Sequence, residues 1–208
     1  MAQVFDERGD GMVIRGGPVE IGKEDRLAHL GRDDAARLLA EALDVYHQVH
    51  ATLPARVFVQ KTSSFSSDEL AGLHDALEMK RVTKGDFVNV PRDPAPRLFR
   101  EGHYPPLRGT FLSLDDQTHL LYTRGSVEFY STYPGLYVPR PLVFQCARTE
   151  ETPKHLAREM LALTKMNWNK TQFDGRLPIT VEAARKVGKV LKYLMESDPI
   201  ASPYRYYM

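Results

Sequence analysis

The chain has 208 residues, of which 42% are hydrophobic and 26% charged, a composition typical of a globular domain that can bury a core. Lys and Arg total 28 against 27 Asp and Glu, so the net charge of +1 restricts any nucleic-acid-binding face to a local patch. The single cysteine, Cys146, excludes a disulfide framework and favours a reducing compartment. No run approaches the roughly 20 apolar residues of a membrane span and no signal pattern opens the chain, so we expect a cytoplasmic protein without a membrane partner.

The first part of the chain predicts a strand pair followed by a helix. Residues 2–5 and 11–17 are strand patterns joined by a polar turn. Apolar residues then recur at spacings of three and four over residues 33–53, which predicts an amphipathic helix. Asp33 or Asp34 is the expected N-cap of this helix.

A polar cluster follows the next predicted strand. Residues 56–60 are strand formers, and Lys61, Thr62 and Ser63 come directly after them. A buried strand would therefore deliver these side chains at its carboxyl end. Ser66 and Glu69 then form the capping-box pattern that starts a second helix, so this part of the chain is an α/β unit.

The middle of the chain predicts further strands separated by Gly, Pro and Asp turns. Their expected ranges are 81–90, 98–100, 109–114, 119–123 and 142–145. Residues 131–141 are too rich in proline for a central strand, and we expect an irregular surface loop there.

Two helices are predicted after the last strand. Thr152 followed by Pro153 is an N-cap with proline at the first helical position. Thr180 is the expected N-cap of the last helix, which has one apolar and one basic face. The basic face, made by Arg185, Lys186, Lys189 and Lys192, is either a solvated surface or a binding surface, and the pattern alone does not decide.

Residues 163–173, between these two helices, contain the only tryptophan together with two asparagines, two lysines and two threonines. One interpretation is a turn with Met166 and Trp168 in the core, since Asn and Asp favour turns for local reasons. The other is a grip on a polyanionic strand, since amides, hydroxyls and ammonium groups are the donors that contact phosphates.

Common catalytic patterns are missing from the sequence. The glycines at residues 9–17 match no phosphate-binding fingerprint, the histidines show no metal-ligand spacing, and the serines lie in no nucleophile elbow. The strand end at residues 60–63 offers an amide, an amine and hydroxyls rather than the carboxylates that hold Mg²⁺.

Several segments in order resemble the PIWI domain of prokaryotic Argonaute proteins. They are Gln60-Lys61-Thr62-Ser63, Arg108-Gly109-Thr110, the residues 137–141, the residues 163–173, and Leu177-Pro178-Ile179-Thr180 with its helix. The resemblance covers nearly the whole chain, and we expect residues 1–208 to form one PIWI domain. It implies an RNase H-like α/β fold with a mixed central sheet flanked by helices, and the use of a short guide RNA or DNA to bind a complementary target strand.

The resemblance also implies that this member does not cut its target. Cutting relatives carry an Asp-Glu-Asp tetrad completed by Asp or His, whereas Thr62 stands at one acid position and Asn167 at or next to another. The strand of the first acid and the MID domain, which holds the guide 5′ phosphate, are absent from the sequence. We therefore expect a C-terminal portion of a PIWI protein, acting with the missing portion and with an associated effector in prokaryotic defence.

The resemblance assigns binding roles to nine residues. Lys61, Thr62 and Ser63 would lie near the former catalytic cleft and Arg140 in the loop. Guide phosphates would be contacted by Asn167, Asn169, Lys170 and Thr171. The C-terminal carboxylate of Met208 would reach the guide 5′ phosphate and could share a Mg²⁺ ion there, while no metal is expected for catalysis.

Two other functions fit the sequence. A metal-dependent RNase H-like nuclease would need acids outside the family pattern, and Asp10, Asp86 and Asp93 are the candidates. A scaffold subunit of a split Argonaute would dock a separate MID-bearing chain and bind no nucleic acid by itself.

Overall fold

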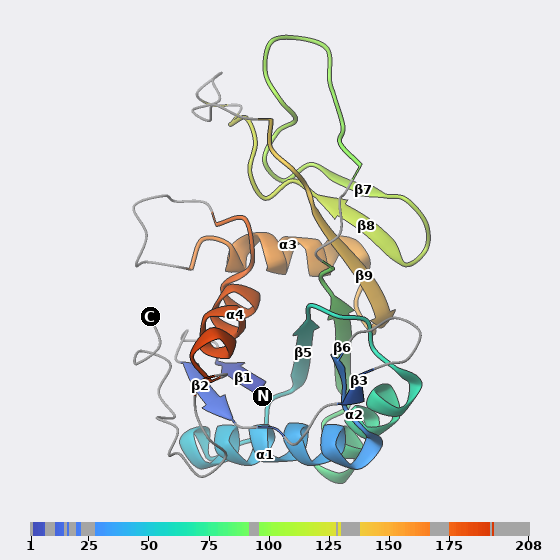
Figure 1. Ribbon diagram of the computed structural model, residues 1–208, viewed down its shortest axis with the longest axis vertical. Helices are drawn as coiled ribbons and strands as arrows, with labels where there is room; N and C mark the ends of the chain where they lie inside the picture. The colour runs from blue at the N-terminus through green and yellow to red at the C-terminus, as the bar shows by residue number, and fades with distance from the viewer. Residues whose placement is uncertain are drawn as a thin grey trace.

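The centre of the molecule is a five-stranded mixed sheet with the strand order β5-β6-β9-β8-β7 (Figure 1). The computed structural model describes residues 2–6, 11–14, 16, 20–21, 28–91, 96–127, 129, 138–166, 175–191 and 193. The strands are β5 (Arg56–Lys61), β6 (Lys84–Asn89), β9 (Leu142–Arg148), β8 (Thr118–Leu121) and β7 (Phe111–Ser113). β5 and β6 run parallel and the other neighbours antiparallel, so the ends of β5 and β6 and the start of β9 meet at one edge.

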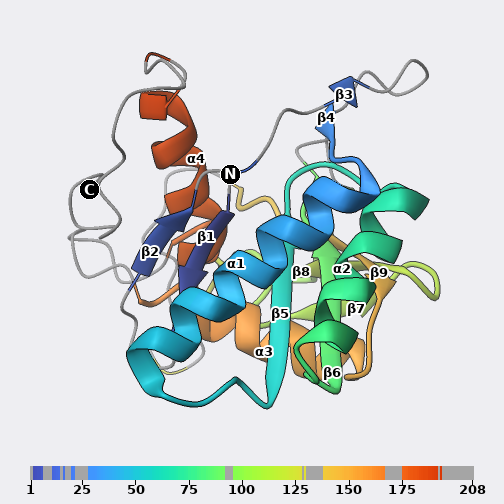
Figure 2. The ribbon, with the colours of Figure 1, turned by 90° about the horizontal axis from the view of Figure 1, so that it is seen from below.

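Helices cover both faces of this sheet (Figures 1 and 2). On one face, α1 (Arg32–His50) and α2 (Ser67–Met79) bury a core with β5 and β6, built from Ala35, Leu39, Leu43, Leu73, Ala76, Leu77, Val82 and Phe87. On the other, α3 (Pro153–Leu163) and α4 (Ile179–Leu191) bury a core built from Val88, Val90, Leu121, Leu142, Phe144, Cys146, Leu156, Ala157, Met160 and Val181. This arrangement confirms the predicted α/β class with a mixed sheet between helices.

Two small strand pairs complete the described fold. The predicted pair at the start of the chain forms β1 (Ala2–Phe5) and β2 (Gly11–Ile14), whose Val13 and Phe5 pack against Ala183 and Val187 of α4. A further pair, β3 (Glu20–Ile21) with β4 (Ala28–His29), was not predicted from the sequence, because two-residue strands carry no alternation pattern.

Local sequence signals place the starts of α2 and α3 correctly. The Ser66 hydroxyl accepts a hydrogen bond from the Glu69 amide at 3.1 Å, and the Glu69 carboxylate accepts one from the Ser66 amide at 3.0 Å, which confirms the capping box. The Thr152 hydroxyl accepts from the His155 amide, with Pro153 at the first helical position. Among the described residues, no helix combines the length and hydrophobicity that crossing a bilayer requires.

Two predicted N-caps and one predicted strand were wrong. The N-cap of α1 is Gly31 without a side-chain bond, and Asp33 and Asp34 lie inside the first turn. α4 begins at Ile179, so Thr180 is not its N-cap. Residues 98–100 form no strand, because tertiary contacts rather than a ladder satisfy the Leu98 backbone.

Candidate nucleic-acid interface

The candidate site lies at the edge where β5 and β6 end. Thr62 follows β5, Val90 and Pro91 follow β6, and Leu142 opens β9 beside them. The first turn of α4 is fastened to the same edge, since the Thr180 hydroxyl donates to the Gln60 side-chain oxygen at 2.7 Å. The carboxyl ends of parallel strands are the usual ligand-binding edge of an α/β sheet.

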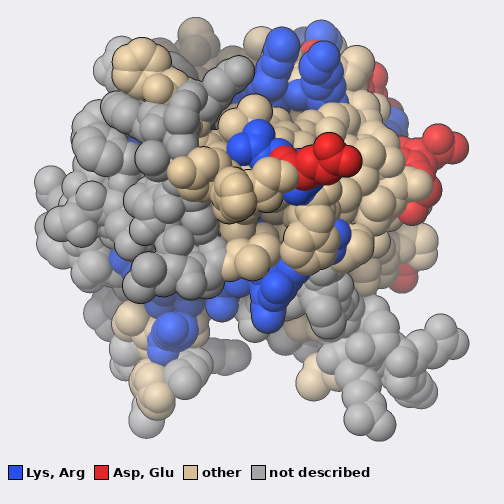
Figure 3. All heavy atoms as spheres, turned by 90° about the horizontal axis from the view of Figure 1, so that it is seen from above, with Lys and Arg blue, Asp and Glu red and all other residues tan. Residues whose placement is uncertain are grey.

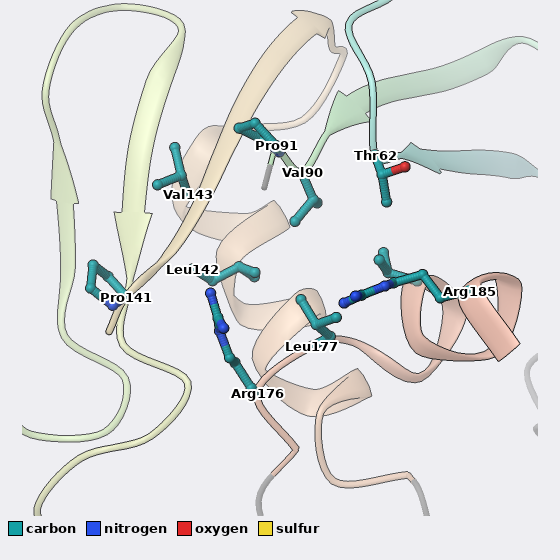
Figure 4. Close-up of a pocket in the computed structure, with 10 residues that line it drawn as sticks. Thr62, Val90, Pro91, Pro141, Leu142, Val143, Arg176, Leu177 and Arg185 are labelled. Atoms are coloured by element: carbon teal, nitrogen blue, oxygen red, sulfur yellow. The ribbon is translucent and has the colours of Figure 1, made fainter. Parts of the chain in front are cut away.

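A cavity of about 170 Å³ opens at this edge (Figure 4). Its lining combines the strand ends with the segment leading into α4: Thr62, Val90, Pro91, Pro141, Leu142, Val143, Arg176, Leu177, Val181 and Arg185. None of these residues is acidic. In Figure 4, Arg185 reaches from α4 toward the centre of the cavity and Arg176 rises beside Leu142, whereas the Thr62 hydroxyl points away from Arg185.

The two arginines give the cavity its charge. Both side chains are exposed, and neither makes an ion pair with any residue that the structure describes. From above (Figure 3), Lys and Arg side chains appear in several groups on the described part of the face, while Asp and Glu lie mainly at the right-hand margin, with one acidic group nearer the middle. A guanidinium group presents a planar set of donors that matches a phosphate, so two of them at one cavity suit an anionic backbone.

Lys61, for which phosphate contact stays a prediction, makes three internal hydrogen bonds in the structure. Its ammonium group donates to both carboxylate oxygens of Glu69, at 2.5 and 2.7 Å, and to the Ser64 carbonyl at 3.1 Å. These three bonds use all the protons that a lysine can donate. Burial raises the pKa of the Glu69 carboxyl, but the bonds from Lys61, Ser66 and Leu30 outweigh it and hold that pKa below its ordinary value.

The other predicted binding residues divide into two groups. The Ser63 hydroxyl donates to the Ala28 carbonyl at 3.3 Å, and Arg140 is exposed next to Pro141 at the cavity. Asn167, Asn169, Lys170, Thr171 and Met208 lie outside the described residues, so their phosphate contacts stay predictions. The Gly175 amide donates to the Thr164 carbonyl at 2.9 Å, so the chain on either side of residues 167–174 is joined next to Arg176.

Of the acids named in the nuclease hypothesis, the structure describes only Asp86, and Asp86 does not line this cavity. Asp86 is fully buried within β6, where one oxygen accepts from Arg56 at 2.5 Å and the other from the Glu150 and Glu151 amides. Asp10 and Asp93 lie outside the described residues. Within the described ranges, no three His, Cys, Asp or Glu side chains are grouped so that they could hold a metal ion.

Sequence reasoning did not single out Arg176, and it left Arg185 undecided between a solvated and a binding surface. Arg176 lies before α4, and Arg185 lies about two turns into it. Their shared cavity depends on how α4 docks against β5 and β9, which no local pattern encodes. A signal that could have found them is the pair of cations flanking a helix start next to the strand-end cluster.

The structure thus combines a mixed sheet, two helices on each face and a basic cavity at the strand ends. Solved structures of prokaryotic Argonautes have a similar fold. The Aquifex aeolicus Argonaute matches with a TM-score of 0.66 and 19% identity, covering 88% of this chain and 25% of that one. The Clostridium butyricum Argonaute bound to a guide DNA and a 19-mer target DNA matches with a TM-score of 0.65 and 16% identity, covering 94% and 27%.

A third match is the Marinitoga piezophila Argonaute in complex with a 5′ OH guide RNA, with a TM-score of 0.57 and 16% identity, covering 90% of this chain and 26% of that one. The chain thus spans about a quarter of the length of these proteins. No protein-family model matches the sequence, and no curated protein matches it. The likeness establishes the fold.

Proposed function

We propose that this chain is a PIWI-type portion of an Argonaute-like protein, and that it binds a short guide strand and its complementary target without cutting the target. The fold shared with solved Argonautes supports this proposal. Sequence specificity would come from base pairing, while the protein contacts shape and charge. A role in prokaryotic defence, together with an associated effector, belongs to the same proposal.

The observation that carries the proposal is the convergence of Arg176 and Arg185 on a cavity that has no acid among its described lining residues. A site for catalytic Mg²⁺ needs carboxylate oxygens, and the positive charge of two guanidinium groups would repel a metal ion there. The same groups stabilise a phosphodiester directly. Thr62, at the end of β5, adds no charge to the cavity.

The test is nucleic-acid binding measured by fluorescence anisotropy at several salt concentrations. Each phosphate contact contributes a slope of about −0.9 in log K against log salt. We expect Arg176→Gln and Arg185→Gln each to weaken binding for every sequence and to make the slope about 0.9 shallower. Arg37→Gln on α1 removes an equal charge far from the cavity and should leave the slope unchanged.

Two results would overturn parts of this proposal. An affinity that stays flat between about 50 and 200 mM salt would contradict backbone binding. Mn²⁺-dependent cutting of a guide-matched target by the purified protein would contradict the non-cleaving role and favour the nuclease hypothesis.

A further inference from the structure

The described residues 96–110, between β6 and β7, project beyond the sheet (Figure 1). A buried tyrosine holds this segment through hydrogen bonds. The Leu98 amide donates to the Tyr122 hydroxyl at 2.7 Å, and the same hydroxyl lies 3.4 Å from the Leu98 carbonyl that accepts its proton. Tyr122 is fully buried. Leu98 is therefore fixed by a core side chain, although residues 98–100 form no strand.

The residue after Leu98, Phe99, has an exposed aromatic ring, and an arginine lies on either side of it in the sequence. Phe99 is 78% exposed, and its neighbours Arg97 and Arg100 are exposed as well. The Arg100 side chain donates to the Tyr104 carbonyl at 3.2 Å, which closes the short turn after Phe99. Glu101 is the only acid in the exposed run 96–104, so the run keeps a net positive charge.

Two consecutive residues, Tyr122 and Thr123, connect the segment that carries Phe99 with the cavity. Tyr122 bonds the Leu98 backbone, and the hydroxyl of the next residue, Thr123, donates to the Arg176 carbonyl at 2.8 Å. Thr123 is also fully buried, and its carbonyl accepts from Arg108 at 3.0 Å. The backbone next to the exposed ring and the backbone of Arg176 are thus hydrogen-bonded to two consecutive buried residues.

We propose that Phe99, with Arg97 and Arg100, is a stacking platform for an unpaired nucleotide of the strand held at the Arg176–Arg185 cavity. The proposal rests on the proposed function and adds a second contact, to a base instead of the backbone. An aromatic face stacks on any base, and neighbouring cations attract the phosphates of that nucleotide. Phe99 and the exposed Tyr104 form a small aromatic surface beside charged groups, which suits a nucleotide better than it suits a protein interface with its wide apolar patch.

The experiment compares a blunt guide/target duplex with one that carries a few unpaired nucleotides at one end, including 2-aminopurine as a stacking probe. Base stacking on an aromatic side chain corresponds to a roughly fivefold or larger effect on affinity. We expect Phe99→Ala and Phe99→Leu to weaken only the duplex with the extension by at least about fivefold and to abolish quenching of the probe. Phe99→Trp should retain both.

Met79→Ala is the matched control, because Met79 is 64% exposed at the end of α2, on the opposite side of the molecule from the projecting segment. It should change neither duplex. If the wild type binds both duplexes and Phe99→Leu behaves like it, the platform is disproved while the proposed function stands. Equal loss for blunt and extended duplexes also disproves it. If neither duplex binds the wild type, both proposals fail.

Discussion

Asp86 tests whether the buried acid of β6 is a structural residue or a metal ligand. Its fully buried carboxylate accepts from Arg56 at 2.5 Å and from the amides of Glu150 and Glu151 at 2.7 and 3.0 Å. In Asp86→Asn, the side-chain oxygen can still accept from the backbone amides of Glu150 and Glu151. The new side-chain NH₂ group, however, would face the N–H donor of Arg56 and could not accept its hydrogen bond. Breaking a buried ion pair costs about 3–5 kcal/mol.

Arg56 keeps a second partner, which sets the expected magnitude. Its guanidinium donates to both oxygens of Glu159 at 2.6 and 3.0 Å, so it is not left unpaired in the variant. We therefore expect Asp86→Asn to lower the free energy of unfolding by about 2–3 kcal/mol, below the full cost of a broken pair. Glu159→Gln, at a side chain that is 32% exposed, should cost about 1 kcal/mol or less.

Urea unfolding followed by circular dichroism measures both variants. The refuting result is an Asp86→Asn protein that unfolds like the wild type but loses a Mn²⁺-dependent cutting activity that the wild type possesses. That outcome would make Asp86 a metal ligand and remove its role as the partner of Arg56.

Three further predictions concern the edge of the sheet and the core. Thr62→Asp should weaken nucleic-acid binding by about tenfold, because a carboxylate at the rim of this cavity would offset the positive charge of its arginines and repel phosphate; tighter binding by anisotropy would contradict this. Glu69→Gln should lower the free energy of unfolding by about 3 kcal/mol near neutral pH, because Lys61 loses its partner. The folded pKa of Glu69 lies below its ordinary value, so this stabilisation is fully present above the unfolded pKa of about 4.3. It is lost as the pH falls through the folded pKa, and the urea midpoints of the variant and the wild type should converge in that pH range. Burial raises the pKa of the Cys146 thiol to about 11, so its alkylation at mildly alkaline pH should be roughly 100-fold slower in the folded chain than in urea; equal rates would show that the thiol is accessible.

The elements that could be predicted from the sequence are those whose causes lie within a few residues. Ser66 and Glu69 cap α2 through bonds between residues three apart, and Thr152 with Pro153 starts α3 in the same way. The polar end of β5 follows from its strand formers and the cluster after them. The mixed sheet, by contrast, was expected from the resemblance to the PIWI domain and not from a local pattern.

The errors have tertiary causes. Residues 98–100 have the composition of a strand, but the Tyr122 hydroxyl takes both backbone groups of Leu98, leaving no ladder there. Thr180 has the composition of an N-cap, yet its hydroxyl donates to Gln60 across the gap between α4 and β5. In both cases a hydrogen bond to a residue distant in the sequence replaced the hydrogen bond that the local sequence pattern predicts.

The polar cluster after β5 shows how strand geometry divides a site. Successive side chains on a strand point to opposite faces, so Gln60 and Thr62 lie on the α4 side while Lys61 lies on the α2 side. The residues of the cluster therefore do not present their side chains to one common face, although they are adjacent in sequence. Lys61 stabilises the start of α2 through Glu69, and the positive charge of the cavity comes from Arg176 and Arg185 instead. A ligand at this edge must accordingly approach from the side of α4, where the donors are.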